Sequence, residues 1–144
     1  MKLRSLPLFL SALLVVGCSK APTTTPPAGG TPAPAGGGHG ALVSLGSMKV
    51  GDLTIAVAQE GAFEAGHEVG FDLTFEKDKM PATVRAWVGV EAGTGSVKKK
   101  FGKENETTMH GHVEVPKPLP EGSLLWVETE SADGTAKASI AFRK

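Results

Sequence analysis

The chain has 144 residues, of which 40% are hydrophobic, 21% charged and 6% aromatic, and its formal net charge is zero. This length allows one small domain but hardly two. Because phosphate recognition usually needs an excess of Lys and Arg on one face, the balanced charge argues against a nucleic-acid partner.

Residues 1–18 have the pattern of a secretory signal. Lys2 and Arg4 precede an apolar run over 6–16 that is too short to span a bilayer. The run ends in VVGC at 15–18, which resembles the bacterial lipobox, where the cysteine receives lipid and becomes the mature N-terminus. The resemblance implies a cell-envelope lipoprotein held in the lipid bilayer through acylated Cys18. Ser19, in place of Asp, implies the outer membrane facing the periplasm if the source has two membranes.

Cys18 is the only cysteine in the sequence. If it carries the anchor, no thiol is left for a disulfide or a cysteine nucleophile. A blue-copper site is excluded too, because it requires a Cys thiolate.

Residues 19–40 form a Pro/Gly-rich segment, with five Pro and six Gly among 22 residues. Such a composition cannot bury enough apolar surface to offset chain entropy, so we predict a disordered tether. It would span roughly 25 Å as a flexible coil and up to about 70 Å if extended. His39, near its end, is interpreted as a solvated linker residue, with a metal ligand as the alternative.

Residues 41–144 alternate between polar and apolar over short runs separated by Gly, Asp, Lys and Pro, which is typical of β-strands. Side chains at 53, 55 and 57, at 69 to 75, and at 84 to 90 share apolar faces with a period of two. About seven strands in such a length favour an immunoglobulin-like antiparallel β-sandwich over a closed barrel. We predict strands at 41–45, 53–59, 68–76, 83–91, 107–115, 123–130 and 135–142, with a short additional strand at 48–50 and a hairpin turn at 133–134.

The strand at 107–115 carries the most informative motif, His110-Gly111-His112. On a strand the two histidines and Glu114 project to one face, while Met109, Val113 and Val115 project to the other. Histidines at i and i+2 stand roughly 7 Å apart at their base, close enough for both rings to bind one metal ion. We therefore predict a zinc or copper site at His110 and His112, with Glu114 as a ligand or as a hydrogen-bond partner of one.

Spacing along the chain does not identify a further ligand for this predicted metal site. Met109 points away from the histidine pair unless the strand bulges at Gly111. The remaining candidates, Met48, His67 and Met80, lie in predicted turns or strand edges. The competing interpretation of the pair is an exposed polar strand face without any ligand.

The segment HGHVEVPKPLPEGS at 110–123, together with AWVGV at 86–90, resembles small exported bacterial β-sandwich proteins that carry a His-x-His strand. It is also similar, more distantly, to the YtkA-like and FixH-like periplasmic domains. Copper handling or support of membrane-protein assembly is proposed for those domains. The resemblance implies that His110 and His112 bind copper, although the chain lacks a Met-Pro-rich segment.

The sequence does not favour an enzyme. It has no Gly-x-Ser-x-Gly segment, and its Gly run at 36–38 lies in the tether and not between a strand and a helix. A His-x-His strand also resembles copper-zinc superoxide dismutase, but that resemblance implies six His ligands, and the chain has four His in all.

The alternative function is an interaction or structural module that docks on a cell-envelope protein. Trp87 and Trp126 are either core residues or exposed anchors for such a partner. The basic cluster at 98–103 is interpreted as a solvated loop balanced by Glu104 and Glu106, or as a contact for anionic lipid head groups or an acidic partner.

Overall fold

The computed structural model describes residues 40–132 and 134–144. The predicted signal sequence with Cys18, and the predicted tether up to His39, lie outside the described residues. Within the described part of the chain, no helix is long and apolar enough to cross a membrane.

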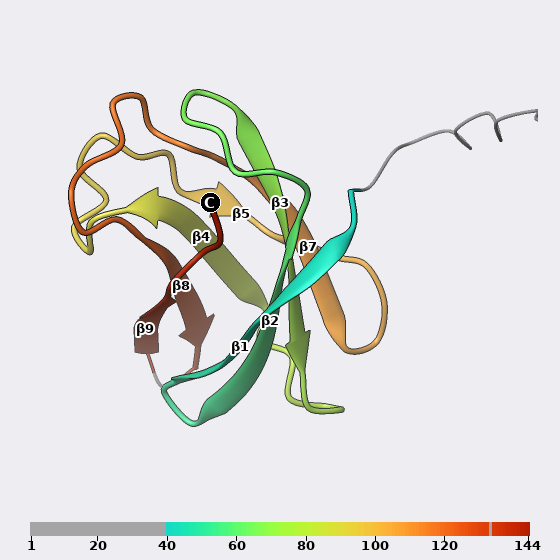
Figure 1. Ribbon diagram of the computed structural model, residues 1–144. Helices are drawn as coiled ribbons and strands as arrows, with labels where there is room; N and C mark the ends of the chain where they lie inside the picture. The colour runs from blue at the N-terminus through green and yellow to red at the C-terminus, as the bar shows by residue number, and fades with distance from the viewer. Residues whose placement is uncertain (1–39, 133) are drawn as a thin grey trace, which may run out of the picture. The chain divides into compact units, whose positions relative to one another are not determined.

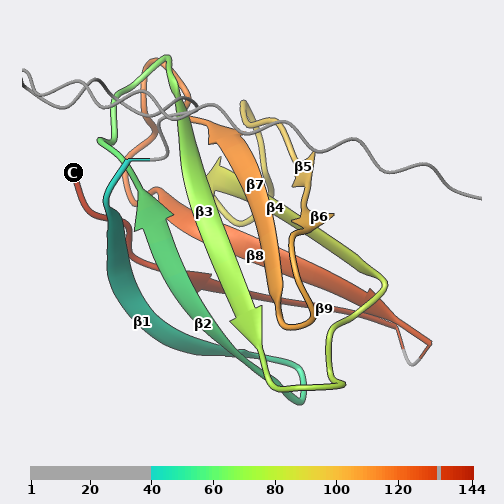
Figure 2. The same cartoon turned by 90° about the vertical axis from the view of Figure 1, so that its right-hand side faces the viewer.

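Two antiparallel sheets pack face to face as a sandwich (Figures 1 and 2). One sheet has five strands in the order β1-β2-β3-β7-β6, and the other has four in the order β5-β4-β8-β9. The strands are β1 (Leu42–Val50), β2 (Leu53–Glu60), β3 (Glu68–Phe75), β4 (Thr83–Gly89), β5 (Lys99–Lys100), β6 (Gly102–Lys103), β7 (Thr108–Glu114), β8 (Leu124–Ser131) and β9 (Gly134–Ile140).

The strand order confirms the predicted immunoglobulin-like class. If β2, β3, β4, β6, β7, β8 and β9 are named A to G, the sheets read A-B-E-D and C-F-G, which is the immunoglobulin constant-type arrangement. β1 adds a strand outside A, and β5 adds one outside C.

Every predicted long strand is present, and at the N-terminal end of the domain two predicted strands are joined into one. The segments predicted at 41–45 and 48–50 form the single strand β1, because a bulge between Ser44 and Gly46 shifts the register and lets pairing with β2 continue. Gly46 takes the positive φ of 108° that this irregularity needs. β8 and β9 pair as the predicted hairpin, although Asp133 of its turn is outside the described residues.

The core lies between the sheets and is made by the alternating apolar positions predicted for it. Ile55, Phe71, Leu73, Val88 and Val113 are all completely buried there. On β7 the same alternation sends Met109 and Val113 inward, so the intervening positions face outward from the five-stranded sheet.

Trp87 is buried, which excludes the exposed-anchor alternative, but it lies on the outer face of the four-stranded sheet. Its ring stacks on Trp126 with centroids 6.1 Å apart, and its Nε1 donates to the carbonyl of Val90 at 2.9 Å. The ammonium of Lys98 lies 4.2 Å from the ring centroid. The segment after β4 therefore covers this tryptophan, and Trp87 is not an exposed anchor.

The basic cluster at 98–103 is divided between the two sheets. Lys98 pairs with Glu128 at 2.9 Å, and Lys99 pairs with Glu68 at 3.2 Å. Phe101 between β5 and β6 is buried in the core. Two of the cluster's cations are thus engaged by carboxylates on other strands.

Candidate metal centre

Strand β7 places both predicted histidines on the outer face of the five-stranded sheet. Its pairing with β3 is regular along its whole length, with Asp72 opposite His110 and Gly70 opposite His112. Because no bulge interrupts β7 at Gly111, Met109 stays on the core side.

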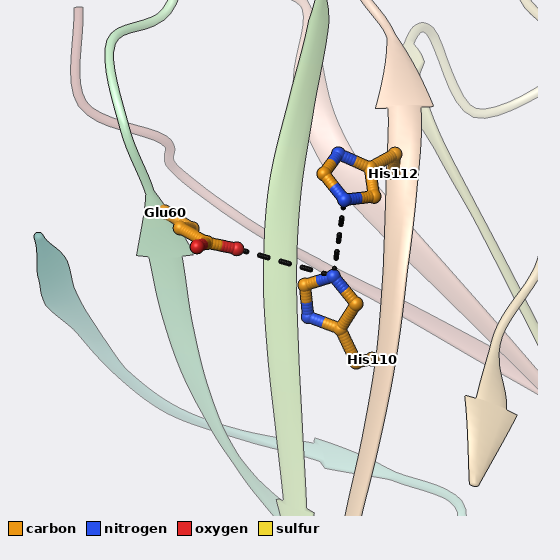
Figure 3. A group of neighbouring side chains, drawn as sticks. All are labelled: Glu60, His110 and His112. Carbon is orange, nitrogen blue, oxygen red and sulfur yellow. Dashed lines mark hydrogen bonds and ion pairs between the residues drawn. The ribbon is translucent and has the colours of Figure 1, made fainter. Parts of the chain in front are cut away.

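The two imidazole rings converge (Figure 3). Their Nε2 atoms lie 3.2 Å apart, and the ring planes meet at 78°. Two nitrogens bound to one tetrahedral zinc ion at 2.0–2.1 Å would stand about 3.3 Å apart. The observed separation is that of a hydrogen bond between the two rings, and it is also close to that of two ligands on a common metal ion.

A third donor, Glu60, comes from the end of β2. Its Oε2 lies 3.9 Å from Nε2 of His110, and the ligand atoms of Glu60, His110 and His112 all lie within 4.8 Å of one another. Only 5% of the Glu60 side chain is exposed. A carboxylate held this far from water beside two imidazoles is a suitable third ligand for a divalent cation.

Gly70 on β3 makes room for this carboxylate. Glu60, Gly70 and His112 form one row across three strands, so Glu60 must reach over β3 to approach the histidines (Figure 3). A Cβ atom on Gly70 would lie 2.7 Å from Oε2 and 3.1 Å from Cβ of Glu60. The missing side chain is what allows a β2 residue to join a site on β7.

Asp72 orients His110 from the neighbouring strand. Its Oδ1 lies 2.7 Å from Nδ1 of His110. With a proton on Nδ1 donated to this carboxylate, the neutral ring presents the lone pair of Nε2 toward Glu60 and His112. This is the arrangement of carboxylate, histidine and metal in which the carboxylate fixes the ring's tautomer.

A cavity of about 350 Å³ lies beside these residues. Its lining comprises Gly40, Leu42, Glu60, Asp72, Glu104 and His110. Glu104 belongs to a second group of close donors with Asp72 and His110. The cavity gives solvent and ions a route to the buried carboxylate.

The sequence prediction located only part of this group. His110 and His112 are brought together, whereas Glu114 is exposed opposite Glu68 and belongs to neither donor group. His67 is an exposed residue whose Nε2 lies 3.7 Å from Glu64. Met48 is in the core, and Met80 packs against it.

The sequence analysis did not identify Glu60, Gly70 or Asp72 as residues of the site. The one sequence feature that could have pointed to these residues is Asp72 itself, an acid in the middle of the mostly apolar run VGFDLTF at 69–75. Glu60 is the last residue of its strand, where a charge is unremarkable in the sequence.

Comparison of the chain with protein-family models, with curated proteins and with solved structures returns no significant match. The chemistry of this centre is therefore argued from its own geometry.

Proposed function

We propose that this chain is a lipid-anchored protein of the cell envelope whose β-sandwich binds a zinc or copper(II) ion through Glu60, His110 and His112. One observation carries the metal assignment. Two imidazole nitrogens 3.2 Å apart meet a buried carboxylate from a strand that is not adjacent to theirs. The proposed role is binding of the ion and not catalysis.

The donor set favours zinc or copper(II) over copper(I). Imidazole and carboxylate suit zinc, and affinity for such ligands rises further for copper(II). Copper(I) prefers soft sulfur donors, but Met48 and Met109 are buried in the core, away from the histidine face. Neither methionine sulfur can reach the histidines unless the core repacks.

The proposed anchor rests on the sequence. The lipobox-like VVGC at 15–18 supports acylation of Cys18, and several acyl chains on one residue suffice for stable membrane attachment. In a bacterium with two membranes, Ser19 favours the outer membrane, and the tether would let the sandwich stand off the bilayer in the periplasm.

Calorimetric titration tests the metal assignment. A soluble form from Lys20 to Lys144 keeps every core residue, since all of them lie between Leu45 and Phe142. We expect stoichiometric binding of Zn²⁺ and Cu²⁺ that is lost in the double variant His110→Ala, His112→Ala. The control is His67→Ala, because that exposed histidine lies outside both donor groups. Binding that survives the double substitution contradicts the proposal.

Docking on a protein partner has less support. Docking through an apolar surface requires a contiguous exposed apolar patch. Among the described residues the exposed large hydrophobic side chains are Leu42, at 58% exposure, and Val97, at 47%. Trp87, the candidate anchor for a protein partner, is covered by the segment after β4.

A further inference from the structure

The three donors of the proposed centre all rise from one face of one sheet. Glu60 and His112 lie in the same row across β2, β3 and β7, and His110 is on the same outer face of β7 (Figure 3). In the described part of the chain all strands belong to the two sheets, so no third layer covers this face. An ion held by these donors therefore has protein on its sheet side and no strand on its outer side.

The donors on this face fill three positions of the ion. Zinc in proteins is almost always four-coordinate, and a site with three protein ligands leaves the fourth position to water or to an external molecule. Among the described residues, Asp72 and Glu104 form a donor group with His110 that does not include His112. Asp72 is engaged at Nδ1 of His110, whereas Nε2 faces the other two ligands. Because the three ligands approach from the sheet, the fourth position of a tetrahedron points away from it.

This outer side is accessible. His112 is exposed, and 21% of the His110 side chain is exposed as well, although Glu60 beneath them is buried. The cavity of about 350 Å³ adjoins Glu60 and His110, and Leu42, which also lines it, is an exposed residue. A small molecule, or a side chain of another protein, can therefore reach the ion without displacing a strand.

Charge around the cavity favours a neutral ligand over an anion. Its lining contains the carboxylates of Glu60, Asp72 and Glu104 and no Lys or Arg. The two positive charges of the ion and the three negative charges of the carboxylates leave a net charge of −1, which repels an approaching anion and not a neutral donor. Imidazole is the neutral donor that suits both zinc and copper(II).

We propose that the fourth coordination position of the bound ion is exchangeable and takes an imidazole from outside the chain in preference to an anion. The inference rests on the proposed metal site. The lone pair of the incoming nitrogen replaces a water molecule on the ion, and no covalent bond of the protein changes. Small imidazole compounds and the histidine side chains of a partner protein share this chemistry, so the centre is a point of attachment for either.

Electron paramagnetic resonance of the Cu²⁺-loaded full chain in detergent micelles tests the exchange. The nitrogen couplings in the spectrum count the imidazoles on the copper, and we expect this count to rise from two to three when millimolar imidazole is added. Equilibrium dialysis in the same buffer checks that the copper stays on the protein. A blocked Gly-His-Gly peptide is the second probe. Binding of both probes assigns the position to histidine side chains as well, and binding of imidazole alone assigns it to small molecules.

The charge preference is measured with azide, an anion that binds copper through nitrogen. Because copper itself discriminates between imidazole and azide, the effect of the cavity is measured with a substitution. We expect Glu104→Gln to tighten azide binding by about threefold to tenfold, since one negative charge beside the position is removed, and to leave imidazole binding within about twofold. Glu114→Gln is the control, because that exposed acid lies on β7 outside both donor groups.

The outcomes separate this inference from the proposed function. If copper stays bound through His110 and His112 but imidazole adds no third nitrogen, the fourth position is not exchangeable and the metal site stands. If azide affinity is the same in Glu104→Gln as in the unsubstituted chain, the preference for a neutral ligand is refuted. Copper binding that survives the double variant His110→Ala, His112→Ala overturns both the inference and the proposed function.

Discussion

Substituting Gly70 separates metal binding from folding. Gly70→Ala adds a methyl group on the outer face, 2.7 Å from Oε2 of Glu60, a distance that real contacts do not reach. The atom that must move most is the far end of a flexible side chain, and the 3.1 Å approach to Cβ of Glu60 needs a shift of only a few tenths of an ångström, so the backbone of β3 can stay nearly in place. The carboxylate of Glu60 is then displaced from the position that faces His110.

The size of the effect follows from these distances. A carbon–oxygen contact needs at least about 3.2 Å, so Oε2 must move by roughly 0.5 Å, whereas metal–ligand distances tolerate only about 0.2 Å. We expect Zn²⁺ affinity to fall at least tenfold, or about 1.4 kcal/mol. The metal-free protein should keep its stability within about 1 kcal/mol, because alanine gains roughly 0.5–1 kcal/mol over glycine within a strand and the tight contact with Glu60 offsets this.

Calorimetry with Zn²⁺ and thermal unfolding of the metal-free protein measure the two quantities. Gly102→Ala is the matched control, because Gly102 lies on the other side of His110 and a Cβ there has nothing nearer than 3.9 Å. Gly102→Ala should bind as the unsubstituted protein does. Unchanged Zn²⁺ affinity in Gly70→Ala would refute the role assigned to Glu60, and loss of folding would refute the claim that only a side chain yields.

Three further substitutions probe other contacts. Asp72→Asn should lower Zn²⁺ affinity by about 10–100-fold without changing the fold. The Asn amide can donate a hydrogen bond to Nδ1 of His110, which favours the tautomer that carries its proton on Nε2, the nitrogen that binds the metal. Equal affinity by calorimetry would exclude the orienting role of Asp72. Gly111→Ala would bring a Cβ within 2.7 Å of the buried Phe101 ring and should lower the free energy of unfolding in urea by about 1–3 kcal/mol. An unchanged unfolding midpoint would show that the Phe101 ring is free to move. The hydrogen bond and charge of Lys79 hold the pKa of Glu76 below its usual value, so this pair's stabilisation is lost as pH falls through that lowered pKa. Because both side chains are exposed, Glu76→Gln should leave the melting temperature at pH 7 unchanged, and a clear decrease would contradict this.

The sequence was sufficient for the fold because the fold depends on local alternation. Of the positions predicted to share apolar faces at 53–57, 69–75 and 84–90, all but Val90 fill the core or pack against it. Even the face of β7 that carries His110 and His112 followed from the period of two. The short strands β5 and β6 were missed because two residues each are too few to show a pattern.

The candidate site was predictable only where its residues lie on one strand. The third donor depends on register between strands, which places Glu60 two strands from His112 with Gly70 between them. No spacing along the chain encodes that row. Glu114, which is adjacent in sequence to the motif, instead lies opposite Glu68 at the end of β7.

Diffraction data from crystals of the zinc-loaded protein, collected on both sides of the zinc absorption edge, would locate the ion in the β-sandwich. We expect one anomalous peak about 2.0–2.2 Å from Nε2 of His110, Nε2 of His112 and a carboxylate oxygen of Glu60. A peak elsewhere on the chain, or no peak at full zinc saturation, would contradict the proposed site.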